Sequence, residues 1–455
     1  MRAKRALTTP LESIGICFEG LVPSAICSCS KDGTPNVTYL SIVHRIDDHH
    51  VGLTFQFFNK TRRNLQENPR AQVIVASPET GCQYRLNLVY ERTETEGSLF
   101  DRVKTRLDAV ASQTGMSHVF KLRGVDVYQV LECRPVSSNL GAEVAPADHM
   151  AELDALTERL AACCDLDSLL DTAMHALSSL FGYDHLFLMV PDEDGKRLYT
   201  LASHGFETSG VGSEVLVGEG IVGVAAERRM TVRSTSMVRD VVYSRAVRSG
   251  VEHRGKRGQL EQEIPLPGLT SAQSQLVVPL LAQNELLGVL CLQSPVAGRF
   301  LASDERLMQI AARHLASRMA LLQIAAAQAT PDKPGPLSAA SRTPLQSARQ
   351  AVIKHFLSDD TVFIDDLYLI KGIAGRIFWK LLQLHSGTGR VEFSNKEIRL
   401  DSTLQLPDIK DNLEARLILL RRRLDERCNF LRLTRAGRGR FHLQIERRLA
   451  LEEHP

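Results

Sequence analysis

Residues 57–69 read FFNKTRRNLQENP, where an apolar run gives way to cations, a hydroxyl group and amides. The Asn68-Pro69 pair predicts the end of a short helix, because the residue before a proline disfavours the helical conformation. A strand that opens into cations and a helix start is suited to bind an anion such as a phosphate. A polar turn followed by a short helix, without any ligand, accounts for the same residues.

The length and composition are those of an ordinary multidomain protein. At about 150 residues per domain, a chain of 455 residues predicts roughly three folded units. Its formal net charge is only +2, so the charge of the whole chain does not identify a partner. The 9 cysteines form no C-x-x-C pair, which argues against a disulfide framework or a metal site. With no secretory signal after MRAKRALTTP and no apolar run of about 18 residues, the sequence predicts a reduced, cytoplasmic protein without membrane segments.

Two stretches rich in small residues, polar residues or prolines indicate linkers, PVSSNLGAEVAPADH (135–149) and AAAQATPDKPGPLSAASRTPLQSA (325–348). A long irregular insert over about 238–272 suggests a lid or disorder. The predicted organisation is therefore multidomain, with domains at 1–136, 150–325 and 349–455 and a linker at 326–348.

The first domain alternates apolar and polar side chains in short runs, which is typical of a β-barrel. The expected strands are SAICSCS, NVTYLSIVHRI, HVGLTFQFF, AQVIVASP, CQYRLNLVYERTETEG and DVYQVLEC, with the helix SLFDRVKTRLDAVASQTG before the last of them.

The pieces DGTPNV, YLS, K-T-R-R-N-L-x-x-N-P and CQYR, in this order, resemble the flavin-binding split barrel of the pyridoxamine 5'-phosphate oxidase family over about residues 20–133. The resemblance implies a domain that binds FMN between two subunits, and hence a homodimer. A flavin needs cations and hydroxyls for its phosphate and polar groups for its ring edge. The phosphate candidates are Lys60, Thr61 and Asn64, and the ring candidates are Thr38, Ser41 and Gln83.

Two departures from that family argue against its oxidase activity. Thr61 stands where the oxidases carry a second basic residue, and VYQVLECRPV lacks their substrate-binding arginine and histidine. No catalytic residue is therefore assigned. Related barrels bind haem or a deazaflavin, or bind no cofactor at all, and these alternatives stay open.

The second domain is expected to be α+β, with helices flanking an antiparallel sheet. Its segments VGEGIVGVAAERRMTVRS, SQLVVPLLAQNELLGVLCLQS and FLASDERLMQIAARHLASRMALL resemble the GAF family of small-molecule sensors. Cyclic nucleotides are not expected as ligands, because the N-K pair of the members that bind them is missing. A structural role explains the same residues: Gly218, Gly220 and Gly223 as turn and packing residues, and Cys291 as a core residue.

The third domain carries the strongest charge signal. Within residues 409–448, twelve Lys or Arg stand against five Asp or Glu, a net charge of +7. Ile409, Leu413, Leu417, Leu420 and Leu424 share one stripe of a helical wheel, and a Gly-rich hairpin follows. The residues expected to face double-stranded DNA are Asn412, Arg416, Arg422 and Arg423 on the helix and Arg435, Arg438 and Arg440 on the hairpin. A solvated charged face is the alternative.

LEARLILLRRRL and FLRLTRAGRGRFHL resemble the recognition helix and wing of the winged-helix domain of two-component response regulators. Arg440 intervenes before Phe441, where that family has an aromatic residue directly after the second glycine, and no receiver domain precedes the block. The resemblance therefore implies a winged helix-turn-helix controlled by the two preceding domains. Trp379 is expected in the core rather than on DNA.

These features together predict a cytoplasmic transcriptional regulator that senses a flavin, redox or small-molecule signal and binds DNA through its C-terminal domain. An FMN-dependent oxidoreductase with appended regulatory domains is the alternative from the enzyme class. A third hypothesis is an interaction protein with an empty barrel and a basic face for an acidic partner.

Overall fold

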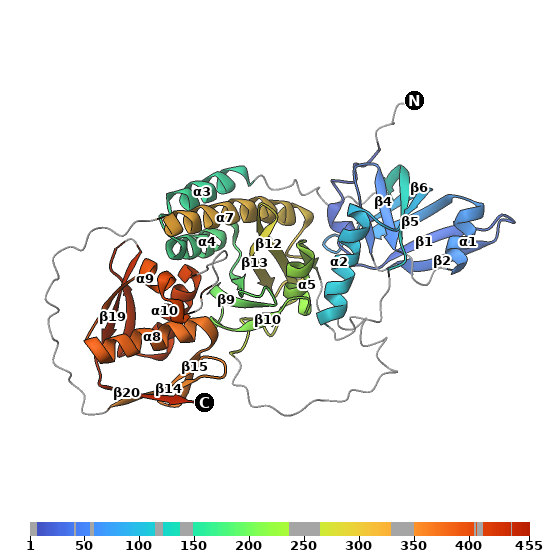
Figure 1. Cartoon of the computed structure of the whole chain (residues 1–455). Helices are drawn as coiled ribbons and strands as arrows, with labels where there is room; N and C mark the ends of the chain where they lie inside the picture. Colours follow the sequence, from blue (N-terminus) through green and yellow to red (C-terminus); the bar gives the residue numbers. More distant parts are fainter. Residues whose placement is uncertain are drawn as a thin grey trace.

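The computed structural model of the chain describes residues 7–40, 42–54, 59–113, 122–136, 149–235, 264–328, 350–404, 406, 413–437 and 439–455. Three domains follow one another along the molecule, and the middle domain lies between the other two (Figure 1). Most of the expected insert and linker falls outside the described residues, although helix α7 continues to Gln328. Among the described helices, none combines the length and the apolarity needed to cross a bilayer.

The N-terminal domain is a curled sheet with the strand order β2-β1-β5-β6-β7-β4-β3, in which all neighbours are antiparallel. Its strands are β1 (Ser24–Cys29), β2 (Pro35–Leu40), β3 (Val43–Arg45), β4 (His50–Thr54), β5 (Arg70–Ala76), β6 (Gln83–Glu94) and β7 (Val125–Pro135). Alternate residues are buried along β1 and β5, as the period of two predicts. The expected single strand NVTYLSIVHRI is two strands, β2 and β3, and Ser41 between them lies outside the described residues.

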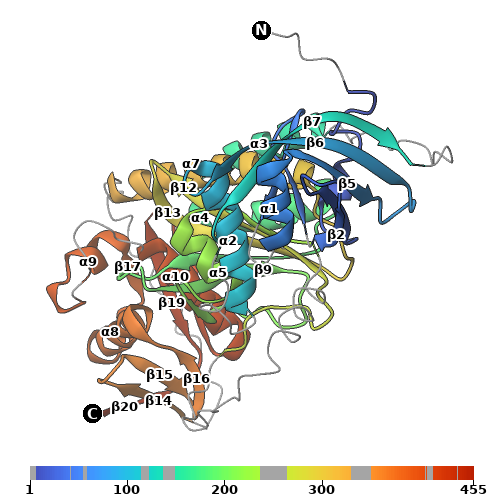
Figure 2. The same cartoon turned by 90° about the vertical axis from the view of Figure 1, so that its right-hand side faces the viewer.

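Three helical segments complete this domain: η1 (Gly15–Phe18), α1 (Asn59–Glu67) and α2 (Ser98–Gln113). The stretch that opens at Asn59 forms α1, which ends just before Asn68-Pro69 as the sequence predicts. Helix α2 lies alongside α5 (Gly220–Arg228) of the middle domain, and Figure 2 shows the two helices next to each other.

The middle domain is a six-stranded antiparallel sheet with the order β10-β9-β8-β13-β12-β11. Its strands are β8 (His185–Pro191), β9 (Arg197–His204), β10 (Glu214–Leu216), β11 (Val232–Ser234), β12 (Ser274–Ala282) and β13 (Glu285–Ser294), and its other helices are α3 (Met150–Ala162), α4 (Leu166–Phe181) and α7 (Ala302–Gln328). The expected single helix before β8 is divided into α3 and α4. The division falls at Asp165, whose side chain accepts a hydrogen bond from the Ser168 N–H and so caps α4.

The glycines of the middle domain play the packing roles that the sequence predicts. Gly218 and Gly220 have φ values of +91° and +62°, which favour glycine. A Cβ on Gly223 would lie 2.2 Å from the Leu216 carbonyl oxygen, so only glycine lets α5 approach β10 this closely. Cys291 is fully buried, as expected.

The C-terminal domain contains two sheets and three α-helices in its described part. Its elements are β14 (Ala351–Phe356), β15 (Thr361–Ile364), β16 (Leu367–Ile370), α8 (Gly372–Thr388), β17 (Glu392–Ser394), α9 (Asn395–Leu400), η2 (Ser402–Leu404), α10 (Leu413–Arg427), β18 (Leu431–Arg435), β19 (Arg440–Ile445) and β20 (Leu449–His454). One sheet has the order β16-β15-β14-β20 and the other β17-β19-β18. Trp379 is buried in α8, as the sequence predicts.

Candidate functional site

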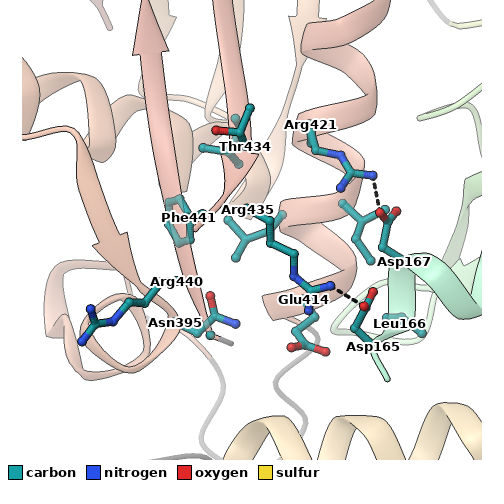
Figure 3. Close-up of a pocket in the computed structure, with 14 residues that line it drawn as sticks. Asp165, Leu166, Asp167, Asn395, Glu414, Arg421, Thr434, Arg435, Arg440 and Phe441 are labelled. Carbon is teal, nitrogen blue, oxygen red and sulfur yellow. Dashed lines mark hydrogen bonds and ion pairs between the residues drawn. The ribbon is translucent and has the colours of Figure 1, made fainter. Parts of the chain in front are cut away.

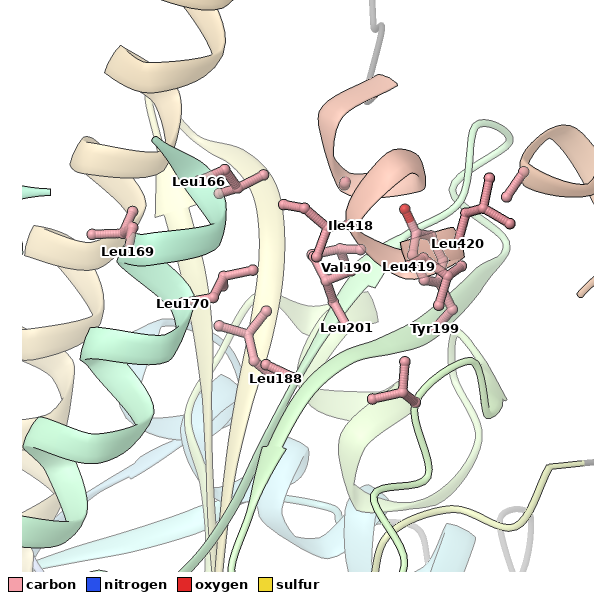
Figure 4. Packing of buried hydrophobic residues seen from close by; sticks show 14 of the residues in the cluster. Leu166, Leu169, Leu170, Leu188, Val190, Tyr199, Leu201, Ile418, Leu419 and Leu420 are labelled. Atoms are coloured by element: carbon pink, nitrogen blue, oxygen red, sulfur yellow. The ribbon is translucent and has the colours of Figure 1, made fainter. Parts of the chain in front are cut away.

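Helix α10 lies between the core of its own domain and the middle domain. Ile418 and Leu419, on the side of α10 away from Leu413 and Leu420, are only 7% and 8% exposed. They belong to one apolar cluster with residues of α4, β8 and β9, and Figure 4 shows them among Leu166, Leu170, Leu188, Val190, Tyr199 and Leu201. The outer face of α10 is therefore covered by the middle domain.

Arg422 is the central polar contact between α10 and the middle domain. Its Nη2 lies 3.1 Å from Asp167 Oδ1 and 2.5 Å from Asp171 Oδ1, and its Nη1 donates to the Leu201 carbonyl oxygen at 3.1 Å. Asp167 and Asp171 are four residues apart on α4 and so share one face of that helix. One guanidinium thus joins α10 to both α4 and β9.

Two further arginines extend this contact toward the start of α4. Arg421 of α10 forms an ion pair with Asp167, and Arg435 at the end of β18 forms one with Asp165 (Figure 3). Burial alone would raise the pKa of Asp165, but the Ser168 N–H and the Arg435 guanidinium outweigh it and hold that pKa below its usual range. The helix and the hairpin therefore both present arginines to the same short row of carboxylates.

Arg416 and Arg423 were expected on a surface that faces DNA, but their side chains are buried. Arg416 is 7% exposed and forms an ion pair with Glu193 of the middle domain. Burial raises the pKa of Glu193, even though Arg416 opposes that shift. Arg423 is 2% exposed and stays within its own domain, donating from Nε to the Leu369 carbonyl oxygen at 3.0 Å and pairing with Glu426 at 3.0 Å. In this arrangement neither guanidinium faces the surrounding solvent.

The other three residues expected to contact DNA are Asn412, Arg438 and Arg440. Asn412 and Arg438 lie outside the described residues. Arg440, at the start of β19, points away from the Asp165 contact in Figure 3. Their contact with DNA stays a prediction.

Sequence reasoning missed the apolar outer face of α10. Ala415, Ile418 and Leu419 are buried, and they lie opposite the stripe formed by Leu413, Leu420 and Leu424. Apolar residues on both sides of a helix are a sign that the helix is covered on both sides. That sign was available in LEARLILLRRRL, although it does not identify the covering domain.

In the N-terminal domain, the phosphate candidates lie together on α1. Lys60 is exposed in the first turn, while Thr61 and Asn64 are buried. Thr61 Oγ1 accepts a hydrogen bond from Asn36 Nδ2 at 2.9 Å, and Asn64 Nδ2 donates to Ser28 Oγ at 3.3 Å. These two side chains therefore fasten α1 to β1 and β2, and Lys60 is the one of the three that faces outward.

The ring candidates are not gathered in the same way. Thr38 lies on β2 two residues from Asn36, so both side chains share one face of the strand that packs against α1. Gln83 begins β6, and β1 and β5 separate that strand from β2. Within one chain, Gln83 is thus apart from the other described candidates.

A cavity of about 980 Å³ lies between the middle and C-terminal domains. Glu214, which lines this cavity, forms ion pairs with Arg197 at 2.9 Å and with Lys371 of the C-terminal domain at 3.2 Å. Because both domains supply its walls, a small molecule bound there would touch both of them. Its lining includes Ile221, Gln275, Gln293, Phe356, Phe363 and Tyr368.

Comparison with known proteins identifies two of the domains. Residues 18–136 match the family model described as pyridoxamine 5'-phosphate oxidase, and residues 165–319 match that of the GAF domain. A search of curated proteins gave no match.

Solved structures resemble the same two regions. The GAF domain of an Acinetobacter phosphoenolpyruvate-protein phosphotransferase is 20% identical, with a TM-score of 0.32 over 40% of this chain and 97% of that one. An FMN-binding protein from Syntrophomonas wolfei is 20% identical, with a TM-score of 0.24 over 28% and 85%. Free methionine-R-sulfoxide reductase from Neisseria meningitidis is 18% identical, with a TM-score of 0.30 over 41% and 98%. By the two family models, the chain carries a pyridoxamine 5'-phosphate oxidase-like N-terminal domain followed by a GAF domain.

Proposed function

We propose that this chain is a transcriptional regulator whose split-barrel and GAF domains control a C-terminal winged helix that binds double-stranded DNA. The observation that carries the proposal is the convergence of arginines from two elements. Arg421 and Arg422 of α10 and Arg435 of the following hairpin reach one short row of carboxylates. A winged helix uses these same two elements, a helix and a hairpin, to contact the groove and the phosphates of DNA.

The charge distribution supports the same proposal. Residues 409–448 carry a net charge of +7 in a chain whose total is +2. The phosphate backbone of DNA attracts such a segment, and the resulting affinity falls as salt rises because bound counterions are released. Helix α9, the short helix η2, helix α10 and the β18–β19 hairpin follow one another in the order expected of a winged helix.

Salt-dependent DNA binding by the full chain tests this proposal. We expect binding to a pool of promoter fragments at low salt, with an affinity that falls steeply as sodium chloride is added. Arg440→Ala should weaken this binding, whereas Arg70→Ala, which removes an exposed arginine of the N-terminal domain, should not. Absence of DNA binding at low salt, both for the wild type and for the variant Asp167→Asn with Asp171→Asn, would overturn the DNA-binding role.

We also propose that the N-terminal domain binds FMN and that the cofactor lies between two chains of a homodimer. Lys60 in the first turn of α1 fits the phosphate, since an ammonium group and a helix N-terminus both favour an anion. Thr61 and Asn64 position α1 from behind, and Thr38 lies on the adjoining strand. When bound, FMN would supply a redox-responsive ring. Haem, a deazaflavin or another small molecule would suit a related barrel.

An absorption spectrum of the purified protein tests the cofactor. We expect the wild type to show visible flavin absorbance. Lys60→Ala should lose this absorbance because it removes the ammonium group, and the control Arg70→Ala should retain it. A colourless wild type that also fails to take up added FMN would overturn flavin binding.

The family match at residues 18–136 favours one further candidate, an FMN-dependent oxidoreductase with appended regulatory domains. Turnover of a reduced nicotinamide by the purified protein, together with an absence of salt-sensitive DNA binding, would favour this enzyme over the regulator.

A further inference from the structure

We propose that the GAF domain holds the DNA-binding face closed, so that the arrangement seen here is an autoinhibited form. The acidic row, defined as Asp165 at the N-cap of α4 with Asp167 and Asp171 on α4, pairs with the arginines that would contact phosphates. This inference rests on the proposed DNA-binding function and names the regulation of that same site.

The ionic part of the contact resembles phosphate binding in its chemistry. Guanidinium groups bind carboxylates and phosphates through the same charge-assisted hydrogen bonds. Arg422 reaches two members of the acidic row, and Arg435 reaches the third from the hairpin. The acidic row and a DNA backbone would therefore compete for the same guanidinium groups.

Because of the apolar part of the contact, α10 can pack against the GAF domain or bind DNA, but it cannot do both at once. Ile418 and Leu419 are buried against the GAF domain and lie between Arg416 and Arg421 along α10. A helix that reads the major groove must enter it, and α10 cannot do so while β8, β9 and α4 cover its outer side. DNA binding thus requires the GAF and C-terminal domains to separate.

Some of the charged side chains in this contact are about half exposed to solvent, which a permanent interface does not require. The side chain of Asp171 is 57% exposed and that of Arg435 is 48% exposed, so both are only partly desolvated. Ion pairs at such positions contribute little stability and break readily. The edge of the interface is thus suited to reversible opening, while the apolar centre keeps the closed form populated.

The decisive experiment compares full-length variants that differ only in where two negative charges are removed. Asp167→Asn with Asp171→Asn removes them from the acidic row. The matched control, Asp154→Asn with Glu158→Gln, removes two exposed carboxylates with the same four-residue spacing on α3. DNA affinity is measured by fluorescence anisotropy over a range of sodium chloride concentrations.

We expect the acidic-row variant to bind DNA roughly ten-fold more tightly than the wild type, which is the size of a typical coupling between sites. The control should match the wild type to within about two-fold, since it changes net charge alone. Equal affinities of wild type and acidic-row variant, with the same salt dependence, would overturn autoinhibition and leave the DNA-binding function standing. An equal gain in the control would overturn it as well. Absence of binding in every variant would instead overturn the proposed function.

A second pair of variants guards against misfolding. Asp171→Lys reverses a charge at a mostly exposed position, so the fold should tolerate it, and Asp154→Lys is its exposed counterpart. Small-angle scattering should show a larger radius of gyration for Asp171→Lys than for Asp154→Lys. Identical scattering curves and identical DNA affinities for these two variants would count against the closed form.

Discussion

Ser112 of the split-barrel domain and Gly220 of the GAF domain are joined by a hydrogen bond across the domain boundary. The Gly220 N–H donates to Ser112 Oγ at 2.8 Å, and the same hydroxyl lies 3.4 Å from the Gly218 carbonyl oxygen. Gly220 is the first residue of α5, and an N–H at that position has no partner within its own helix. Ser112 therefore caps a GAF helix from another domain.

The first prediction concerns this cap. Ser112→Ala should lower the free energy of unfolding by about 1 kcal/mol, because it leaves the first N–H of α5 without its partner. Denaturant titration of the full chain measures the change.

Asp108→Asn, on the same face of the domain contact, is the control. Asp108 pairs with Arg228 at 3.3 Å, but burial raises the pKa of this carboxyl despite Arg228, so its neutralisation should cost little. If Asp108→Asn destabilised the protein as much as Ser112→Ala, interface charge rather than capping would explain the effect.

The elements that the sequence predicted best are those whose pattern is complete within one segment. Alternation in AQVIVASP predicted β5, and the Asn68-Pro69 pair predicted the end of α1. The close packing of Gly223 also follows from local sequence, because a glycine inside a helix is unfavourable unless the space requires it. Each of these features is set by neighbours along the chain.

The docking of α10 could not be predicted in this way. Arg421 and Asp167 are paired although 254 positions separate them in the sequence, and no periodicity connects them. The charge run predicted double-stranded DNA as the partner of the arginines, and that stays a prediction; in this structure Arg421, Arg422 and Arg435 pair with carboxylates of another domain of the same chain. Similarly, Thr61 and Asn64 were expected at a phosphate, whereas Asn36 and Ser28 bind their side chains here.

The second prediction separates a structural from a ligand-binding role for Asn64. Asn64→Ala should destabilise the chain by about 1 kcal/mol, because it removes a buried hydrogen bond that holds α1 on β1. The loss should be equal with and without added FMN, as measured by thermal unfolding. Gln66→Ala, at an exposed position of α1, is the control and should be neutral. A loss seen only in the presence of FMN would assign Asn64 to the cofactor instead.

The third prediction tests the close approach of α5 to β10. Gly223→Ala should cost about 1–3 kcal/mol, because the new Cβ would meet the Leu216 carbonyl oxygen at 2.2 Å and force the backbone to move. Gly387→Ala near the end of α8 meets no atom within 4 Å and should stabilise the protein by about 0.4–1 kcal/mol through the unfolded chain. Relative to the wild type, the unfolding midpoints of the two variants should shift in opposite directions. Two shifts of the same sign would contradict the packing argument.

The fourth prediction concerns pH and the contact between Asp165 and Arg435. The pKa of Asp165 is lower in the folded chain than in the unfolded one, so the carboxylate stabilises the fold at pH values above its usual range. This stabilisation should disappear as the pH falls through the lowered pKa. Asp165→Asn preserves a side chain that can cap α4 and removes only the charge.

The difference in unfolding free energy between wild type and Asp165→Asn should therefore be largest near neutral pH and approach zero in strong acid, where both side chains are uncharged. Urea titrations across the acidic range measure this difference. The Ser168 N–H of α4 and the Arg435 guanidinium of the hairpin both lower this pKa, so the titration reports on the cap of α4 together with the contact between the two domains. A difference that stayed constant with pH would mean that the charge of Asp165 contributes nothing to the closed arrangement.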